Sequence, residues 1–465
     1  MHDSKLVKGK AREETHWQLG WWELLPLVDG PRRPVAWSRA SIIYTAHPVQ
    51  PTVLAKHFSS ARQFVVPSPT LILESSSAYE PPTLISISPT EDWLFAYFPG
   101  RNCDGVGCLW KRGYQLNSWI VRECFHYSQG AGVVAAEWTS SERPWAITDY
   151  GTPYRLPSRG PTYNTNAVPS LLLATQSHQL HAYFLPPAAP EIRSVKVSLL
   201  QPSPIDLPPP EEPHDPTRSH RICTHATIGL SYNEQYVIVA TRSKLIPPLK
   251  ATSPPVDPMD LSLHLDMSSS PAQTDRTELN EWQQWGEESS LDLSMVAFHH
   301  RPPSREDQPS KHYLQVLPLS SIPEVHMQVS DLRFVAVPPG TAPPSPTITR
   351  DPRRPTKDIS VTEKGSLYLV ASGLDFGEYT SLPKSQVSLF TLSRPTAPDG
   401  SWAARLEHAR SFDAESGTVA FLQPLPARNK ILIGILDPVG NMPSSSSKRE
   451  ETRVGSMSVL TLPQD

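Results

Sequence analysis

Two pairs of histidines are the residues whose spacing comes nearest to a metal site in this chain. His178 and His181 lie close together, and His299 is followed directly by His300. A zinc site takes three or four ligands at defined spacings, and neither pair has a third ligand at a suitable distance in sequence. We therefore interpret the first pair as part of a hairpin and the second as surface residues, and we expect no metal site.

The four cysteines do not form a recognisable site either. Cys103 and Cys108 lack the paired spacing of zinc ligands, and Cys124 and Cys223 follow at uneven intervals. Four cysteines placed in this way are too few and too irregular for a disulfide framework. We expect buried free thiols in a reducing compartment.

The motifs of common enzyme classes are missing from the sequence. It contains no phosphate-cradling glycine loop, no nucleophile elbow, no HExxH helix and no Cys-x-x-Cys pair. Gly130-Ala131-Gly132 matches half of a dinucleotide fingerprint, but it precedes the strand-like run Val133–Ala136 and is typical of a hairpin turn. The sequence thus predicts a protein that is not an enzyme, with no catalytic, cofactor-binding or metal-binding residues and no cofactor.

The elements that would have to position any site are clearest between Leu84 and Arg122. Short apolar runs alternate there with polar or glycine-rich breaks, and the run Trp93–Phe98 is too short for a buried helix. Four short strands joined by tight turns predict one blade of a β-propeller, and an antiparallel meander in a sandwich is the alternative. The strands are Leu84–Ile87, Trp93–Phe98, Cys108–Trp110 and Trp119–Val121.

This pattern recurs along the chain at intervals of roughly 50 residues, which is within the range of propeller blades. We count seven or eight units, and no segment keeps a helical period beyond a turn or two. The sequence therefore predicts an all-β fold, a WD40-like β-propeller of seven blades over residues 17–465. The further units are 33–46, 136–147, 171–185, 222–240, 314–337, 359–392 and 418–462.

The end of a propeller ring must be closed, because an open sheet edge invites aggregation. We expect a closing blade with strands from both termini. Trp17–Val28, with three tryptophans and four leucines, is expected to be a strand or short helix that seals part of the fold. Residues 1–16, which are rich in charge, are expected to be a flexible arm.

Two insertions interrupt the pattern. Residues 201–218 are proline-rich and should be extended. Residues 249–293 mix acidic with large apolar side chains, a composition typical of segments that are disordered alone and bind partners. Leu279, Trp282 and Trp285 would share one side of a short helix in a partner's groove, whereas a passive loop is the alternative.

Composition limits the classes of partner. The formal net charge of −4 gives no global positive field, so we expect no direct binding of nucleic acid. No run of 18 or more apolar residues is present, and the first residues lack the apolar core of a secretory signal. We expect an intracellular, soluble protein that does not bind membranes.

The pattern of short strands and turns in one region resembles that of a known family. Leu84–Gly100, Asp104–Trp110 and Gly130–Trp138 are similar to the N-terminal propeller of Mediator complex subunit 16 of fungi, and the resemblance extends from Trp37 to Leu185. That family joins a seven-bladed WD40-type propeller to a C-terminal helical domain in the tail module of Mediator. No helical domain precedes Asp465, which would make this chain a fragment or a shortened form.

The resemblance implies a scaffold subunit of a transcription coactivator in the nucleus. Its expected partners are other Mediator tail subunits and transcriptional activators, with RNA polymerase II machinery reached indirectly. The alternative is another WD40-type interaction scaffold, in ubiquitin transfer or a vesicle coat. A propeller enzyme with its site in the central channel is a more distant alternative, since such enzymes need no linear motif.

Overall fold

The fold is taken from a computed structural model of the chain. With short gaps inside them, the described ranges are 34–139, 143–161, 169–200, 220–246, 286–301, 311–338, 366–375, 384–393, 403–412, 418–436 and 455–462. Within these ranges the regular secondary structure is almost entirely strand. One α-helix, α2 (Thr70–Glu74), and one 3₁₀ turn, η1 (Ser76–Ala78), follow the first sheet. The prediction of an all-β fold is confirmed.

The stretch predicted as one blade is one blade. β5 (Leu84–Ile87), β6 (Trp93–Phe98), β7 (Gly105–Arg112) and β8 (Trp119–Tyr127) pair in chain order as an antiparallel sheet. The turn after β5 is fixed by Ser88, whose Oγ accepts a hydrogen bond from the backbone N of Trp93 at 3.1 Å. β5 is therefore short because a turn residue ends it.

Six sheets of three or four strands lie within the described part of the chain, one fewer than the seven blades predicted. We number them blades 1 to 6 in chain order. Blade 2 is given above. Blade 1 consists of β1 (Val35–Trp37), β2 (Ile42–Ala46), β3 (Val53–His57) and β4 (Gln63–Val65), and blade 3 consists of β9 (Val133–Trp138), β12 (Ser170–Thr175), β13 (Gln179–Phe184) and β14 (Arg193–Ser198).

The second half of the chain forms the other three blades. Blade 4 consists of β15 (His220–Gly229), β16 (Tyr236–Ile246), β17 (Gly286–Arg301) and β18 (Lys311–Pro318), and blade 5 consists of β19 (Gln328–Val337), β20 (Ser366–Asp375), β21 (Lys384–Ser393) and β22 (Ala403–Phe412). Blade 6 consists of β23 (Thr418–Pro424), β24 (Lys430–Leu436) and β25 (Gly455–Thr461).

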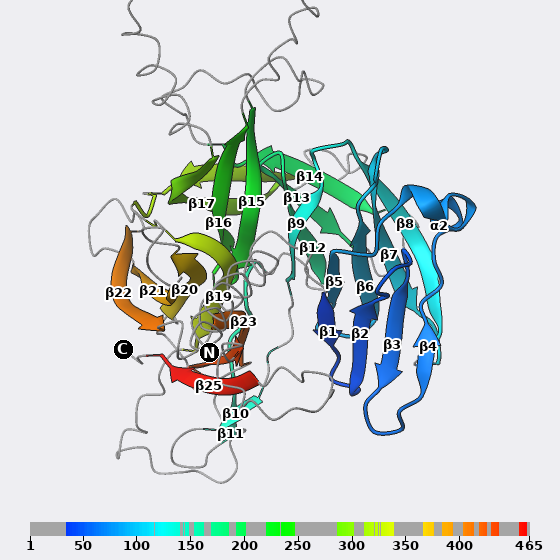
Figure 1. Cartoon of the computed structure of the whole chain (residues 1–465), viewed down its shortest axis with the longest axis horizontal. Helices are drawn as coiled ribbons and strands as arrows, with labels where there is room; N and C mark the ends of the chain where they lie inside the picture. Colours follow the sequence, from blue (N-terminus) through cyan, green and yellow to red (C-terminus); the bar gives the residue numbers. More distant parts are fainter. Residues whose placement is uncertain are drawn as a thin grey trace, which may run out of the picture.

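The blades follow one another around a common centre (Figure 1). The first strand of each blade contacts the first strand of the next, in the series β1, β5, β9, β15, β19 and β23. These strands are therefore the innermost ones, and the later strands of each blade lie progressively farther out. This arrangement defines a β-propeller.

The hydrophobic cores lie between successive blades. Trp110, with 1% of its surface exposed, packs in the core between blades 1 and 2, and Trp93, with 6% exposed, packs in the core between blades 2 and 3. The Nε1 of Trp110 also donates a hydrogen bond to the carbonyl oxygen of Pro67 at 2.7 Å. The prediction that both tryptophans are buried is confirmed, and β6 reads as a continuous apolar run because blade 2 is covered on both faces.

Two groupings of runs into units were wrong, and one turn was wrongly assigned to a hairpin. The run Trp145–Ile147 is β10, which pairs with β11 (Pro153–Arg155) as a separate two-stranded ribbon, while the partner of β9 is β12. The unit 314–337 is divided between β18 and β19, which belong to different blades. The third error is the Gly130–Gly132 turn, which connects blade 2 to blade 3 and closes no hairpin, because β8 and β9 do not pair.

The predicted acidic insertion extends too far at its C-terminal end. Residues 286–293 belong to β17, where they continue the ladder with β16 through pairs such as Lys244 with Glu287. The strand can hold Glu288 and Asp292 because Arg221 of β15 pairs with both carboxylates. The remainder of the insertion, with Leu279, Trp282 and Trp285, lies outside the described residues.

Several other predictions also concern residues that the structure does not describe. These are the arm 1–16, the run Trp17–Val28 and the proline-rich residues 201–218. Among the described strands, those of blade 6 pair only with one another, so the expected joint closure by both termini is not seen there. No helix in the described ranges is long and apolar enough to cross a membrane.

Candidate functional site

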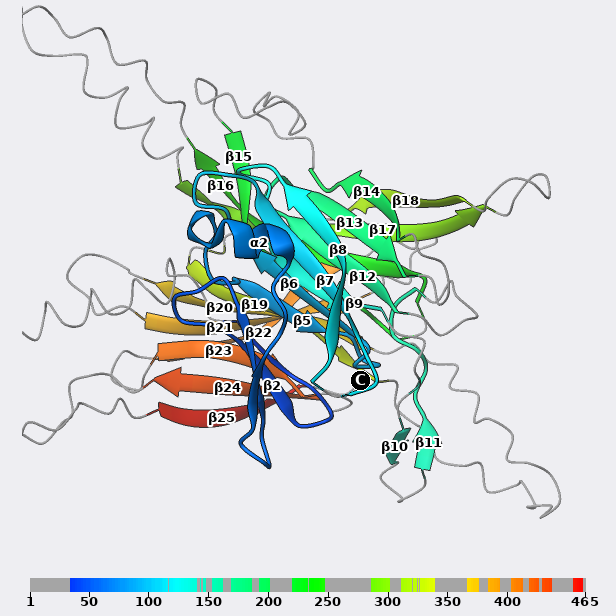
Figure 2. The same ribbon diagram turned by 90° about the vertical axis from the view of Figure 1, so that its right-hand side faces the viewer.

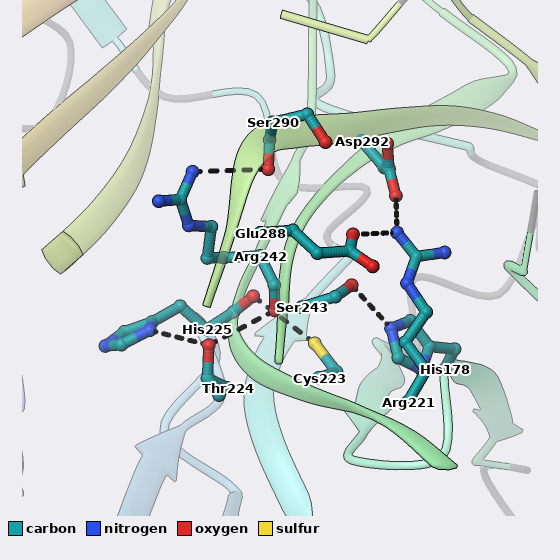
Figure 3. Close-up of polar contacts among 10 residues, drawn as sticks. All are labelled: His178, Arg221, Cys223, Thr224, His225, Arg242, Ser243, Glu288, Ser290 and Asp292. Atoms are coloured by element: carbon teal, nitrogen blue, oxygen red, sulfur yellow. Dashed lines mark hydrogen bonds and ion pairs between the residues drawn. The ribbon is translucent and has the colours of Figure 1, made fainter. Parts of the chain in front are cut away.

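A cluster of buried and half-buried polar side chains lies at the end of blade 4 where β16 stops and β17 starts (Figure 3). The strand starts of β15 and β17 and the end of β16 meet at this edge, because His220 pairs with Ile246 and Gly286 with Leu245. The members are His178 from blade 3 and Arg221, Cys223, Thr224, His225, Arg242, Ser243, Glu288, Ser290 and Asp292 from blade 4.

Local irregularities in β15 and β16 orient these side chains. The pairing register of β15 shifts between Cys223 and His225, and that of β16 shifts between Arg242 and Lys244, as β-bulges do when they redirect side chains. The backbone N of Cys223 donates to the carbonyl oxygen of Gln176 at 2.8 Å, which ties the start of β15 to the hairpin of blade 3. Bulges and this bond therefore place blade 3 and blade 4 groups in one cluster.

Arg221 is the charged centre of the cluster. Its Nη2 donates to Oδ2 of Asp292 at 2.6 Å and also to the carboxylate of Glu288. These bonds run from β15 to β17 across β16, and all three side chains are at most one-fifth exposed. This is the cationic partner that allows the acidic residues 288 and 292 to lie in a strand.

Arg242 links blade 4 to blade 5. Its Nη2 donates to the carbonyl oxygen of Val325 at 2.9 Å and to that of Met327 at 3.3 Å, and its Nη1 donates to the carbonyl oxygen of Ser290 at 3.3 Å. Residues 325 and 327 directly precede β19, and Arg242 is 2% exposed. The guanidinium therefore satisfies backbone acceptors that the entry into blade 5 leaves without a sheet partner.

The cluster holds a thiol and an imidazole, but they do not form an activated pair. Burial raises the pKa of Cys223 to about 12 although the charge of Arg221 opposes the rise, and its Sγ donates to the carbonyl oxygen of His225 at 3.3 Å. Burial, aided by Arg221, lowers the pKa of His178 to about 3, and its Nε2 is 2.9 Å from Oγ of Ser243. At neutral pH the thiol is protonated and the imidazole is neutral, so the cluster serves to join three blades.

The innermost strands carry a second group of charges. Burial raises the pKa of Glu137 on β9, and the charges of Arg159 and Arg333 oppose this rise. Arg333 lies on β19 and pairs with Asp331 at 3.3 Å, while the Nε of Arg159 donates to the carbonyl oxygen of Leu230 at 3.4 Å. A carboxyl with a raised pKa is one requirement of a general acid.

No described group of three or more His, Cys, Asp or Glu residues could hold a metal ion.

The histidines singled out in the sequence have ordinary structural partners. His178 lies in the turn of the β12–β13 hairpin with a φ of 56°, and His181 on β13 is 3.0 Å from Oε1 of Gln179 through its Nε2. The hairpin interpretation of this pair is confirmed. His299 on β17 stacks on Tyr313 with ring centroids 4.8 Å apart, and the side chain of His300 lies outside the described part.

All four cysteines are free thiols, as expected. Cys108 and Cys223 are buried, whereas Cys103 and Cys124 are only half-buried, so the expectation of burial was wrong for the latter two. Cys108 and Cys124 lie opposite each other on β7 and β8. Burial and the neighbouring Cys124 thiol raise the pKa of Cys108, which keeps it protonated.

One exposed element has the character of an interaction site. The β10–β11 ribbon lies at the edge of the molecule, apart from the six sheets, in the view of Figure 2. Trp145 is 62% exposed and Ile147 is 73% exposed, and the guanidinium carbon of Arg155 lies 4.9 Å from the centroid of the Trp145 ring. Tryptophan and arginine are the residue types that most often dominate binding energy at protein interfaces.

Sequence reasoning missed this ribbon because it assigned Trp145–Ile147 to a blade. The available signal was Pro153, since proline at the start of a short strand is typical of an edge and not of a blade interior. The polar cluster was missed for another reason. Its members span residues 178 to 292 and contact a carbonyl group of residue 327, and they meet only because blades 3, 4 and 5 are neighbours.

Comparisons with known proteins gave structural likenesses only. No protein-family model matches the sequence, and no curated protein sequence is significantly similar to it. Among solved structures, the chain is similar to the β-propeller domain of Cps50 (Swd1) from Myceliophteria thermophila, with 11% identity, a TM-score of 0.32 and coverage of 87% of this chain and 93% of that one.

Other similar structures come from different functional classes. The WD40 domain of SCAP from fission yeast has 8% identity and a TM-score of 0.33, with coverage of 92% of this chain and 89% of that one. A putative 6-phosphogluconolactonase from Bacteroides uniformis has 9% identity and a TM-score of 0.36, with coverage of 92% and 85%. At these scores the likeness carries no argument about function.

The strand pairing of the chain itself defines the class. Five blades have four antiparallel strands, each blade continues the ring through its innermost strand, and the cores lie between blades. The protein is a β-propeller with four-stranded blades, the architecture to which WD40 proteins belong.

Proposed function

We propose that the protein is a non-enzymatic scaffold that binds other proteins through surfaces of its propeller. The observation that carries this proposal is the β10–β11 ribbon, which presents Trp145 and Ile147 to solvent on a projecting element. A buried polar cluster with a neutral imidazole and a protonated thiol adds support, because its groups stabilise blade contacts and are not poised for reaction.

The finer form of the proposal is a subunit of the Mediator tail module that relays activator signals to RNA polymerase II transcription in the nucleus. Its support is the resemblance of Leu84–Gly100, Asp104–Trp110 and Gly130–Trp138 to the fungal subunit 16 family. The first region forms β5 and β6 and the second falls in β7, while the third leads into β9, so the resemblance covers consecutive parts of two blades.

Affinity purification of the tagged protein followed by mass spectrometry tests the identity of the complex. Mediator tail subunits should dominate the co-purified proteins. Recovery of ubiquitin-transfer components or vesicle-coat components in their place would contradict the Mediator assignment and leave a propeller scaffold of another assembly. Recovery of no stable partner at all would contradict the scaffold proposal itself.

The ribbon gives a sharper test. The double substitution Trp145→Ala and Ile147→Ala removes the exposed apolar side chains, and it should weaken at least one interaction about tenfold or more, since interface tryptophans often contribute 2 kcal/mol or more. The melting temperature should stay unchanged, because the ribbon packs on no blade core. Ile120→Ala is the matched control, since Ile120 is 57% exposed on the outermost strand of blade 2. Retention of every partner by the double variant would refute a binding role for the ribbon.

A further inference from the structure

Two of the four cysteines face each other across the outer strands of blade 2. Cys108 on β7 pairs directly with Cys124 on β8. The other two have different neighbours, since Cys223 faces Ser243 across β15 and β16 and Cys103 lies in the loop before β7. Directly opposed residues point to the same side of a sheet, so both facing thiols lie on the side of blade 2 that packs toward blade 1.

The spacing of facing strands suits a disulfide. Directly opposed residues of antiparallel strands have Cα atoms about 4.5 or about 5.5 Å apart, and disulfides span about 4.4–6.8 Å between Cα atoms. The ladder also shifts register beside this pair, since Leu109 still faces Glu123 but the next contact joins Trp110 to Val121. A bulge disrupts the ladder locally, which leaves the backbone near Cys124 less constrained than in a regular pair.

The two thiols differ in exposure and in protonation. Cys108 is completely buried, while Cys124 is half-buried on β8, the outermost strand of the blade (Figure 1). The Cys108 thiol donates a hydrogen bond to the sulfur of Cys124, which lowers the pKa of Cys124, although burial and the charge of Glu123 oppose this change. The more exposed sulfur therefore has the greater thiolate character, and its buried neighbour keeps its proton.

We propose that Cys108 and Cys124 form a peroxide-sensitive pair that closes to a reversible disulfide between β7 and β8. In the first step the thiolate sulfur of Cys124 attacks hydrogen peroxide, an S–O bond forms as the O–O bond breaks, and hydroxide leaves. In the second step the sulfur of Cys108 attacks the sulfenic sulfur of Cys124, and the Cys108 proton leaves with the hydroxyl group as water. The pair of thiols loses two electrons, and one peroxide is reduced to two molecules of water.

Contact between the two sulfurs offsets the weak acidity of the buried thiol in the second step. Well-oriented groups within one molecule react as if at effective concentrations of about 10⁵–10⁸ M. The resulting bond would tie β8, which pairs only with β7 in the described sheet, to the rest of blade 2. Because Cys124 is only half-buried, a small dithiol can reach its sulfur and reopen the bond by thiol–disulfide exchange.

Cys103 is the competing thiol. It is half-buried like Cys124, but its Sγ donates to the carbonyl oxygen of Ala78 at 3.5 Å and it belongs to no strand. The facing geometry therefore predicts a disulfide between residues 108 and 124 and not one that includes Cys103.

Peptide mapping of the full chain under non-reducing conditions tests the proposal. The reduced protein is treated with hydrogen peroxide and then with an alkylating reagent, and mass spectrometry identifies each disulfide. The 108–124 disulfide should exceed every other pairing at least about tenfold, because these two thiols are held in contact. Dithiothreitol should return the protein to its reduced form.

Variants separate the two steps. In Cys108→Ala, Cys124 should accumulate as the sulfenic acid, which dimedone captures, and no disulfide should form within the chain. Cys124→Ala should give neither product. Cys103→Ala is the matched control, because it removes another half-buried thiol and should leave the 108–124 disulfide unchanged.

Other outcomes overturn the proposal. A main disulfide between Cys103 and Cys124, or between two chains, would refute the assigned pair. Equal capture of Cys124 by dimedone in Cys108→Ala and in the unmodified protein would show that Cys108 does not complete the reaction. Formation of the 108–124 bond only in urea would show that the folded blade does not permit closure. The disulfide map of the unmodified protein needs no substitution, so it decides the proposal even where a variant does not fold.

Discussion

Acidification should destabilise the propeller through two buried histidines. His178 is 2% exposed and His181 is 9% exposed, and burial lowers their pKa values to about 3 and about 4 from the ordinary 6.5. The charges of Arg221, near His178, and of Lys196, near His181, act in the same direction. Unfolded histidine binds a proton below pH 6.5 while the folded residues do not, so stability is complete above that pH and is lost as pH falls toward the folded values.

The size of the loss follows from these pKa values. Between about pH 7.5 and about pH 5.5, each histidine costs about 1.4 kcal/mol of unfolding free energy, and the two together cost about 3 kcal/mol. Carboxylates with ordinary pKa values near 4 change little over this interval, which keeps the histidine contribution separable. A loss of this size is a large fraction of the stability of a typical domain.

Urea denaturation at the two pH values measures the effect. The double variant His178→Gln and His181→Gln keeps polar side chains but removes both titrations, so its loss of stability on acidification should be smaller by most of the 3 kcal/mol. His126→Gln, at an exposed position on β8, should lose as much as the unmodified protein. Equal losses in the double variant and the unmodified protein would refute the reasoning.

The remaining predictions concern the cores between blades. Trp110→Ala should lower the free energy of unfolding by about 3–5 kcal/mol, because it removes a fully buried ring and its bond to Pro67, while Ile120→Ala should change it by less than about 0.5 kcal/mol. A normally melting Trp110→Ala protein would contradict the assigned packing. Arg242→Met should cost about 2–4 kcal/mol, because buried carbonyls before β19 lose their donors, and Arg122→Met, at an exposed site, is its control in the same denaturation assay. Equal stability of the two arginine variants would show that Arg242 does not hold blade 5.

The sequence predicts a blade well where every strand is bounded by a turn residue. In blade 2, Ser88 marks the end of β5, and the predicted and observed β5 and β6 agree. The third and fourth strands were predicted too short, because Gly105 and Gly107 lie within β7 and β8 continues to Tyr127. Blade 3 was divided wrongly because the partner of β9 follows an inserted ribbon, and apolar periodicity identifies strands without identifying their partners. The grouping of β18 with β19 failed for the same reason, since runs within a blade and between blades have similar spacing.

The wrongly predicted end of the acidic insertion shows what amino-acid composition alone cannot predict. Glu288 and Asp292 belong to a strand because Arg221, on the first strand of the blade, neutralises them. The local composition shows these two carboxylates, but it does not show the cation on β15 that neutralises them. The same dependence on tertiary neighbours explains why the cluster around Arg242, which reaches carbonyl groups of blade 5, has no sequence signature.

The position of the 247–285 connection has a consequence for synthesis of the protein on the ribosome. β16 is buried along most of its length and is paired on both sides, yet its partner β17 is made only after the whole connection has been translated. At roughly 5–20 residues per second, this delay lasts on the order of seconds. During that interval the hairpin of β15 and β16 exposes one unpaired apolar edge, from Tyr236 to Arg242, to other nascent chains. Chaperone binding to ribosome-bound chains should therefore be strongest just before β17 emerges.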